Sequence, residues 1–248
     1  MDSSLQPPAP NPRARPTAGE RAVALLEVLL CSEYPTQIVI AQALTVAGFH
    51  QQNADGSLNV AFVATLSLLD AAVLVGLILL FLTARGDRPS QVLFGTRPAA
   101  SEAAAGIGLM FASMLLAMGV LIVIQLVAPG LRTVEHNPLQ DLLRTPRNAA
   151  VFGLVVIVAG GIREEIQRAF LLNRFERWLG GGVVGIVVIS VGFGLGHEIQ
   201  GWDAVLATGI LGALWGVVYL RRRSIIAPMV AHAGFDLLQL AQFLIIGR

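Results

Sequence analysis

The sequence predicts an all-α membrane protein, a polytopic bundle of about seven to eight transmembrane helices. Its composition points away from a soluble protein, because 55% of the 248 residues are hydrophobic and only 13% are charged. A soluble domain has about 45–50% apolar and about 25% charged residues. The apolar residues also gather into long segments, and a segment of ~20 mostly apolar residues can cross ~30 Å of hydrocarbon.

Six apolar segments are candidates for spans, separated by short Gly-rich or Arg-rich stretches. They cover residues 58–84, 103–127, 149–172, 183–197, 204–220 and 225–246. An earlier segment, 21–49, is interrupted by Glu27, Glu33 and Pro35, and proline breaks the hydrogen-bond ladder of a helix. We expect this segment to form either one kinked span or an interfacial helix followed by a short span.

The rest of the chain predicts a flexible tail at residues 1–20, rich in Pro and polar residues, and a single membrane domain at 21–248. The net charge of +1 argues against a nucleic-acid partner. The single cysteine, Cys31, excludes an internal disulfide. The lipid bilayer is the expected surroundings of this domain.

The distribution of arginine predicts the orientation, since cytoplasmic connections carry an excess of basic residues. All 17 basic residues are arginines, a coding bias that suggests a bacterial source. A cytoplasmic N-terminus puts more of the connection arginines inside than outside. Those inside are then Arg13, Arg15, Arg21, Arg85, Arg88, Arg97, Arg174, Arg177, Arg221, Arg222 and Arg223, and those outside are Arg132, Arg144, Arg147 and Arg248. We therefore expect an integral protein of the bacterial plasma membrane with a cytoplasmic N-terminus.

Ionisable residues within the apolar segments mark candidate functional sites, because each costs ~2.5–3.5 kcal/mol on insertion scales. Three late segments contain them: Glu164, Glu165 and Arg168 in the first, His197 in the second, and His232 with Asp236 in the third. Taken alone, each group can be explained without a function. The first group would be charges at a helix end, the second an imidazole at the membrane interface, and the third a buried His–Asp pair. Together they supply a base, a proton carrier and an oriented donor, which a peptidase needs to activate water and stabilise an oxyanion.

Helical geometry predicts the relative positions of only some of these residues. Glu164 and Arg168 are four residues apart and can pair on one helix face, whereas Glu165 points ~100° away from Glu164. A rise of ~1.5 Å per residue puts Glu164 and His232 at similar depth and His197 further out, so we expect the fifth span to be tilted, shifted or broken. Asp70 is a further candidate in mid-span, either functional or paired with Ser67 or a backbone group.

The three motifs, in this order on successive spans, resemble those of the CPBP intramembrane proteases, also called the CAAX prenyl protease type II or Abi family. The sequences at 193–197 (Phe-xxx-His) and 232–236 (His-xxx-Asp) match the second and third motifs of that family. The resemblance covers roughly residues 153–240. The first motif departs from the family pattern Glu-Glu-xxx-Arg, because only two residues separate Glu165 from Arg168.

The resemblance implies an intramembrane endopeptidase that cleaves a peptide or a membrane protein. It implies that Glu164 and His197 hold and deprotonate the attacking water, that His232 and Asp236 line the oxyanion site, and that Arg168 orients the glutamate. Glu164 is a glutamate position in either register of the first motif, and Glu165 is the alternative base. No cofactor is expected, although Glu164, His197 and His232 are an acceptable zinc set. Two other functions stay open, a catalytically silent membrane scaffold that binds a partner and, less favoured, a proton-coupled carrier.

Overall fold

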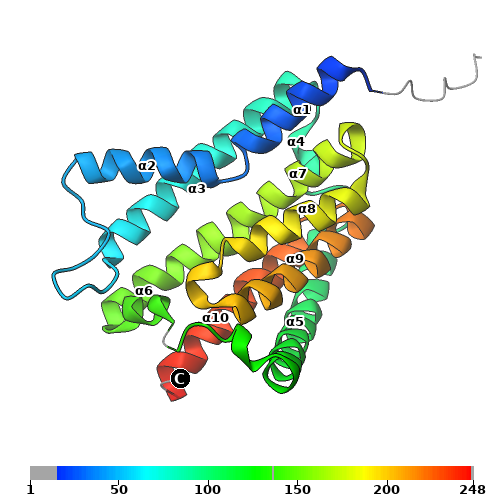
Figure 1. Cartoon of the computed structure of the whole chain (residues 1–248). Coiled ribbons are helices and arrows are strands. Elements are labelled where there is room, and N and C mark those ends of the chain that lie inside the picture. Colours follow the sequence, from blue (N-terminus) through cyan, green and yellow to red (C-terminus); the bar gives the residue numbers. More distant parts are fainter. Residues whose placement is uncertain (1–15, 136, 247–248) are drawn as a thin grey trace, which may run out of the picture.

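The fold was examined in a computed structural model, which describes residues 16–135 and 137–246 (Figure 1). These residues form helices and no β-strand, so the predicted all-α bundle is confirmed. The main helices are α1 (Ala18–Leu30), α2 (Tyr34–Val46), α3 (Val60–Ala84), α4 (Pro89–Leu93), α5 (Ala99–Val127), α6 (Pro146–Val155), α7 (Glu164–Trp178), α8 (Gly182–Leu195), α9 (Trp202–Arg222) and α10 (Ile226–Ile246). Short 3-10 turns η2 (Pro129–Leu131), η3 (Pro138–Leu143) and η5 (Glu198–Gln200) lie in the connections, and the π-helical η4 (Val156–Arg163) joins α6 to α7.

Among the described residues, four helices are long and apolar enough to cross a membrane, namely α3, α5, α9 and α10. A fifth span results if the bent pair of α1 and α2 counts as one. The other predicted spans take different forms among the described residues. The segment 149–172 belongs to the run α6–η4–α7, which carries the charged residues of the first motif, and α8 has 14 residues.

The N-terminal segment is a kinked pair of helices. A reciprocal capping box between Thr17 and Glu20 begins α1 at Ala18, within the stretch predicted as tail; residues 1–15 of that prediction lie outside the described residues. α1 and α2 meet at an angle of 41°. The break falls next to Pro35 in the first turn of α2, where a missing backbone donor is tolerated, and this matches the kinked alternative.

Helix packing brings the late helices together around the candidate residues. α10 packs against α5 and η4, and α8 lies along α9. Buried side chains from α3, α7 and α9, among them Leu74, Phe170 and Tyr219, form the largest apolar cluster. Many large apolar side chains point outward, including Leu80, Leu115, Leu126 and Val188. An apolar exterior of this extent suits a bundle whose solvent is lipid.

The arginine-rich connections meet at one end of the bundle. Arg174 of α7 is fully buried and contacts Glu27 of α1 (Nε–Oε2 2.6 Å) and Asp87 after α3 (Nη1–Oδ2 3.0 Å). Arg223, just after α9, pairs with Glu176 of α7. These ion pairs fasten α1, α3, α7 and α9 to one another where the chain turns (Figure 1).

Candidate functional site

The two glutamates of the first motif begin α7, directly after η4. A π-helical turn inserts an extra residue into a helix and is frequent at functional sites. Glu165 is 1% exposed and pairs with Arg168 through two contacts, Nε–Oε2 and Nη2–Oε1, both 3.1 Å. The geometric expectation that Arg168 pairs with Glu164 is therefore wrong. The shortened motif keeps its ion pair because positions three and four residues apart lie on the same helix face.

His232 receives its orientation from Glu165. The His232 Nδ1 lies 2.9 Å from Glu165 Oε1. Because an ionised carboxylate can only accept, Nδ1 carries the hydrogen of this bond. The opposite nitrogen, Nε2, lies 3.7 Å from Glu164 Oε2 and 3.7 Å from Asp236 Oδ2. Glu165 and Arg168 thus fix one edge of the imidazole, and the other edge faces two further carboxylates.

Aromatic side chains hold the faces of this imidazole. The Trp215 ring of α9 stacks on His232 with ring centroids 4.0 Å apart, and Phe193 of α8 packs edge-on at 5.8 Å. The Trp215 Nε1–H donates to Ser113 Oγ at 3.0 Å. The Arg168 guanidinium lies over the Phe193 ring, 4.7 Å from its centroid. Trp215 and Ser113 have no motif in the sequence to mark them, and only tertiary packing shows their role.

Two glycines in η4 let α10 approach closely. A Cβ on Gly160 would lie 2.8 Å from Asp236 Oδ2, and one on Gly161 would lie 2.5 Å from the Ala233 Cβ. Real Cβ atoms do not approach other atoms so closely, so a side chain at Gly161 would require α10 to move away, and one at Gly160 would require the Asp236 carboxylate to shift. The glycine pair therefore places His232 and Asp236 beside the start of α7.

Glu164 differs from Glu165 in having an oxygen that accepts no hydrogen bond among the described residues. Its Oε1 lies 3.4 Å from Arg163 Nη2, a long contact. Its Oε2 is buried and has no hydrogen-bond partner among the described residues. An unpaired buried carboxylate oxygen is costly. Such an atom is expected where a water or a substrate group is to be bound.

His197 follows the end of α8. Its Nδ1 lies 2.9 Å from the carbonyl oxygen of Phe193. Since a carbonyl only accepts, Nδ1 carries the hydrogen, and Nε2 of the neutral ring keeps its lone pair. α8 is 14 residues long, or roughly 21 Å at 1.5 Å per residue. A short helix, rather than a full span, thus carries His197 to the cavity that Glu164 lines.

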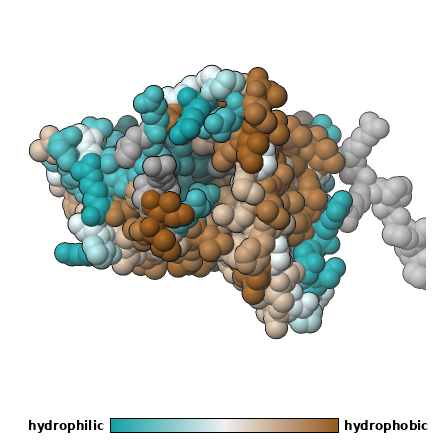
Figure 2. All heavy atoms as spheres, turned by 90° about the horizontal axis from the view of Figure 1, so that it is seen from below, coloured by the Kyte–Doolittle hydropathy of each residue, from teal (hydrophilic) through white to brown (hydrophobic). Residues whose placement is uncertain are grey.

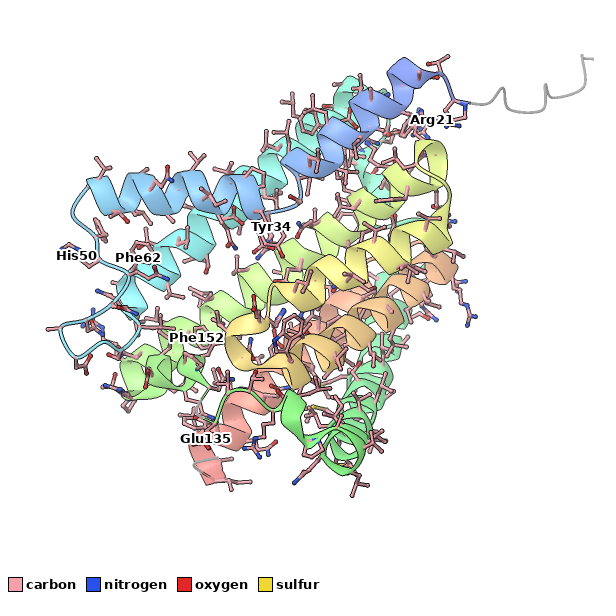
Figure 3. All side chains as sticks on the ribbon, viewed as in Figure 1. Arg21, Tyr34, His50, Phe62, Glu135 and Phe152 are labelled. Atoms are coloured by element: carbon pink, nitrogen blue, oxygen red, sulfur yellow. The ribbon has the colours of Figure 1, made fainter. Side chains whose placement is uncertain are left out.

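Several of these side chains border one cavity of about 1150 Å³, whereas Glu165, His232 and Trp215 lie behind its lining. Its lining includes Glu164, Arg168, His197 and Asp236, together with Glu33 and Tyr34 from the N-terminal helix pair. Seen from below, the bundle has a hollow with hydrophilic atoms beside hydrophobic surface (Figure 2). Tyr34 lies at the bend between α1 and α2 (Figure 3), and its hydroxyl donates to the Gly192 carbonyl of α8 at 3.1 Å.

The zinc alternative is not supported by this arrangement. Within residues 16–135 and 137–246, no group of three or more His, Cys, Asp or Glu side chains is placed to hold a metal ion. The His232 Nδ1 is engaged by Glu165, and its Nε2 lies 3.7 Å from the Glu164 oxygen. The predicted zinc set of Glu164, His197 and His232 is not among such groups in the part of the chain that the structure describes, and it stays a prediction.

Asp70 is on α3 and is not one of the residues that line the cavity. Its Oδ1 accepts from the Thr36 hydroxyl of α2 at 2.5 Å, and its Oδ2 has no partner among the described residues. Ser67, one of the partners considered for it, is therefore not the observed one.

One comparison with known proteins finds a relationship. Residues 146–238 match the family model described as "Type II CAAX prenyl endopeptidase Rce1-like". The matched segment runs from the start of α6 into α10 and contains Glu164, Glu165, Arg168, His197, His232 and Asp236. The resemblance to the CAAX proteases is thus confirmed over this part of the chain. No curated protein and no solved structure matches the chain.

Proposed function

We propose that this chain is an intramembrane endopeptidase that uses Glu164 as its general base. The proposal starts from the match of residues 146–238 to the Rce1-like CAAX prenyl endopeptidases. The family match and the apolar helices indicate an integral membrane protease of the CAAX type. The observation that carries the choice of base is the Oε2 of Glu164, which is buried and accepts no hydrogen bond among the described residues, on a side chain that borders the cavity. Both Glu165 oxygens are engaged by Arg168 and His232.

The proposed reaction begins with a water held between Glu164 and His197. Glu164 takes one proton as the water oxygen attacks the scissile carbonyl carbon, and His197 Nε2 accepts a hydrogen bond from the other. A protonated His232 donates Nε2–H to the oxyanion, and Asp236, 3.7 Å from that nitrogen, favours the imidazolium. The C–N bond then breaks, and Glu164 returns its proton to the leaving amine, giving a carboxylic acid and an amine.

The proposed substrate is a peptide or a segment of a membrane protein. The printed family description names prenyl endopeptidases, but a cavity of about 1150 Å³ also has room for an unmodified peptide. We propose a cytoplasmic N-terminus and a plasma-membrane location, on the arginine distribution alone.

The test is cleavage of a fluorogenic peptide library, with prenylated and unmodified members, by the detergent-purified protein. Glu164→Gln and Glu165→Gln are compared with the wild type, each with and without a chelator. We expect Glu164→Gln to lower kcat by roughly 10²–10⁴-fold, the range for a general base, and the chelator to have no effect.

Other outcomes contradict this proposal in different ways. Residual activity in Glu164→Gln together with its complete loss in Glu165→Gln would make Glu165 the base. Chelator sensitivity would restore the zinc reading. Absence of cleavage of every peptide by the wild type would favour the scaffold function.

A further inference from the structure

Glu33 lies outside the segment that matches the protease family, yet it borders the same cavity as Glu164. It lies at the break between α1 and α2, and its carboxylate forms an ion pair with the guanidinium of Arg163 at the end of η4. The two contacts are Nη1–Oε2 at 2.5 Å and Nη2–Oε1 at 2.8 Å. Paired contacts of this kind are among the stronger ion pairs, and the Arg163 side chain is only 4% exposed.

The break that carries Glu33 is fastened to the helix that carries Glu164. The Gln167 Nε2 donates to the Cys31 carbonyl at 2.8 Å, and Arg163 Nη1 donates to Gln167 Oε1 at 3.2 Å. Glu33 itself has φ +78°, in the left-handed region. A non-glycine residue held there has a strained backbone, and this strain must be offset by its surroundings. The ion pair between Glu33 and Arg163 is a contact that can offset this strain.

Arg163 has a second carboxylate within reach. The Glu164 Oε1 lies 3.4 Å from Arg163 Nη2, further than either Glu33 oxygen from its partner nitrogen. Glu33 therefore competes with Glu164 for one buried cation and has the better geometry. If Arg163 turned fully to Glu164, it would hold that carboxylate in its ionised form and draw it away from a water.

We propose that Glu33 is a positioning residue of the protease site, which holds Arg163 so that Glu164 stays free to take a proton from the attacking water. This inference rests on the proposed function, and it adds the N-terminal helix pair to the active site. The residues involved are Glu33 from the break, Arg163 from η4 and Glu164 from α7.

The other charged groups around this triplet come from four elements. Asp70 on α3 is within electrostatic reach of Arg163, and its Oδ1 is held by Thr36 at 2.5 Å. The remaining groups are Arg168 and Glu165 on α7, His197 after α8, and His232 and Asp236 on α10. Arg168 is taken by Glu165, so Glu164 is the carboxylate in hydrogen-bond reach of Arg163 once Glu33 is neutral.

The experiment is a double-mutant cycle on peptide cleavage, with Glu33→Gln, Arg163→Gln and the double variant. We expect Glu33→Gln to lower kcat by about 10-fold, because Glu164 would then stabilise the transition state less well. The KM should stay within twofold of the wild-type value. The acid limb of its kcat–pH profile should move to lower pH. Adding Arg163→Gln should recover most of the lost kcat, because the competing cation is then gone. Glu33→Asp should keep more activity than Glu33→Gln.

Glu27→Gln is the matched control, since Glu27 is a second glutamate of the N-terminal helix pair that binds arginines, in its case Arg174 and Arg85 at the far end. It should lower the melting temperature without moving the pH profile. A Glu33→Gln variant with wild-type kcat and pH profile would overturn the inference alone. So would a loss that Arg163→Gln fails to relieve, which would mean a purely structural role. A wild type that cleaves nothing, or a Glu164→Gln variant as active as wild type, would instead overturn the proposed function.

Discussion

Trp215 stacks on His232 with the two rings 27° from parallel, and the indole is itself held by Ser113. The imidazole of α10 thus receives its orientation from α9 and, through the indole N–H, from α5. Glu165 fixes the edge of the same ring. A histidine held on both a face and an edge has little freedom to rotate, which is the preorganisation that an oxyanion donor requires.

The first prediction concerns this stack. Trp215→Leu should lower kcat at least tenfold and the free energy of unfolding by about 3–5 kcal/mol, the usual range for removing a large buried aromatic side chain. Trp215→Phe keeps a ring over His232 but loses the bond to Ser113, and should keep more of both. Peptide cleavage and thermal unfolding in detergent measure the two effects.

Trp202→Phe provides the control for this prediction, because Trp202 is 41% exposed and lies at the start of α9, away from His232. Equal loss of activity in the Trp202 and Trp215 variants would show that the stack has no special role.

The second prediction concerns the close approach of η4 and α10. Gly160→Ala should displace the Asp236 carboxylate, since the added Cβ would lie 2.8 Å from its Oδ2. We expect a fall in kcat of roughly 10-fold or more, because misplacement of a catalytic group by about 1 Å can cost 100-fold. Gly153→Ala on α6 is the control, because a Cβ there meets no atom within 4 Å. Unchanged kcat in Gly160→Ala would contradict the assigned place of Asp236 in the site.

The third prediction concerns stability at the arginine-rich end. Arg174→Gln removes the buried partner of Glu27 and Asp87 and should destabilise the protein by about 3–5 kcal/mol, as expected when one member of a buried ion pair is lost. Arg177→Gln, at a side chain 40% exposed on the same helix, should cost at most about 1 kcal/mol. Urea or thermal unfolding followed by circular dichroism measures both. Equal effects of the two substitutions would refute the argument from burial.

The composition, the apolar segments and three short motifs were enough to predict an all-α membrane protein and the resemblance to the CAAX proteases that the family match supports over residues 146–238. Three of the predicted site residues, Glu164, His197 and Asp236, line one cavity, and His232 lies next to Glu164 and Asp236. These features were readable because they depend on local patterns. Whether those side chains carry out the reaction stays a prediction.

The partner of Arg168 could not be read in the same way. Helix geometry brings both Glu164 and Glu165 close to Arg168, at four and three residues, and the choice falls to Glu165 because His232 from α10 also binds there. Two other contacts join residues that are far apart in the chain. They are the stacking of Trp215 on His232 and the ion pair of Glu33 with Arg163. Such contacts are made by tertiary packing and leave no periodic signal in a single sequence.

The shortness of α8 sets a condition on the surrounding lipid. Its 14 residues give roughly 21 Å of helix, against ~30 Å of hydrocarbon in an ordinary bilayer, and its valines face outward. A short hydrophobic element draws the bilayer thinner around it. We expect headgroups and their hydration water to lie closer to His197 in consequence, so that the acyl-chain length of the host membrane controls how readily water reaches the proposed hydrolytic site.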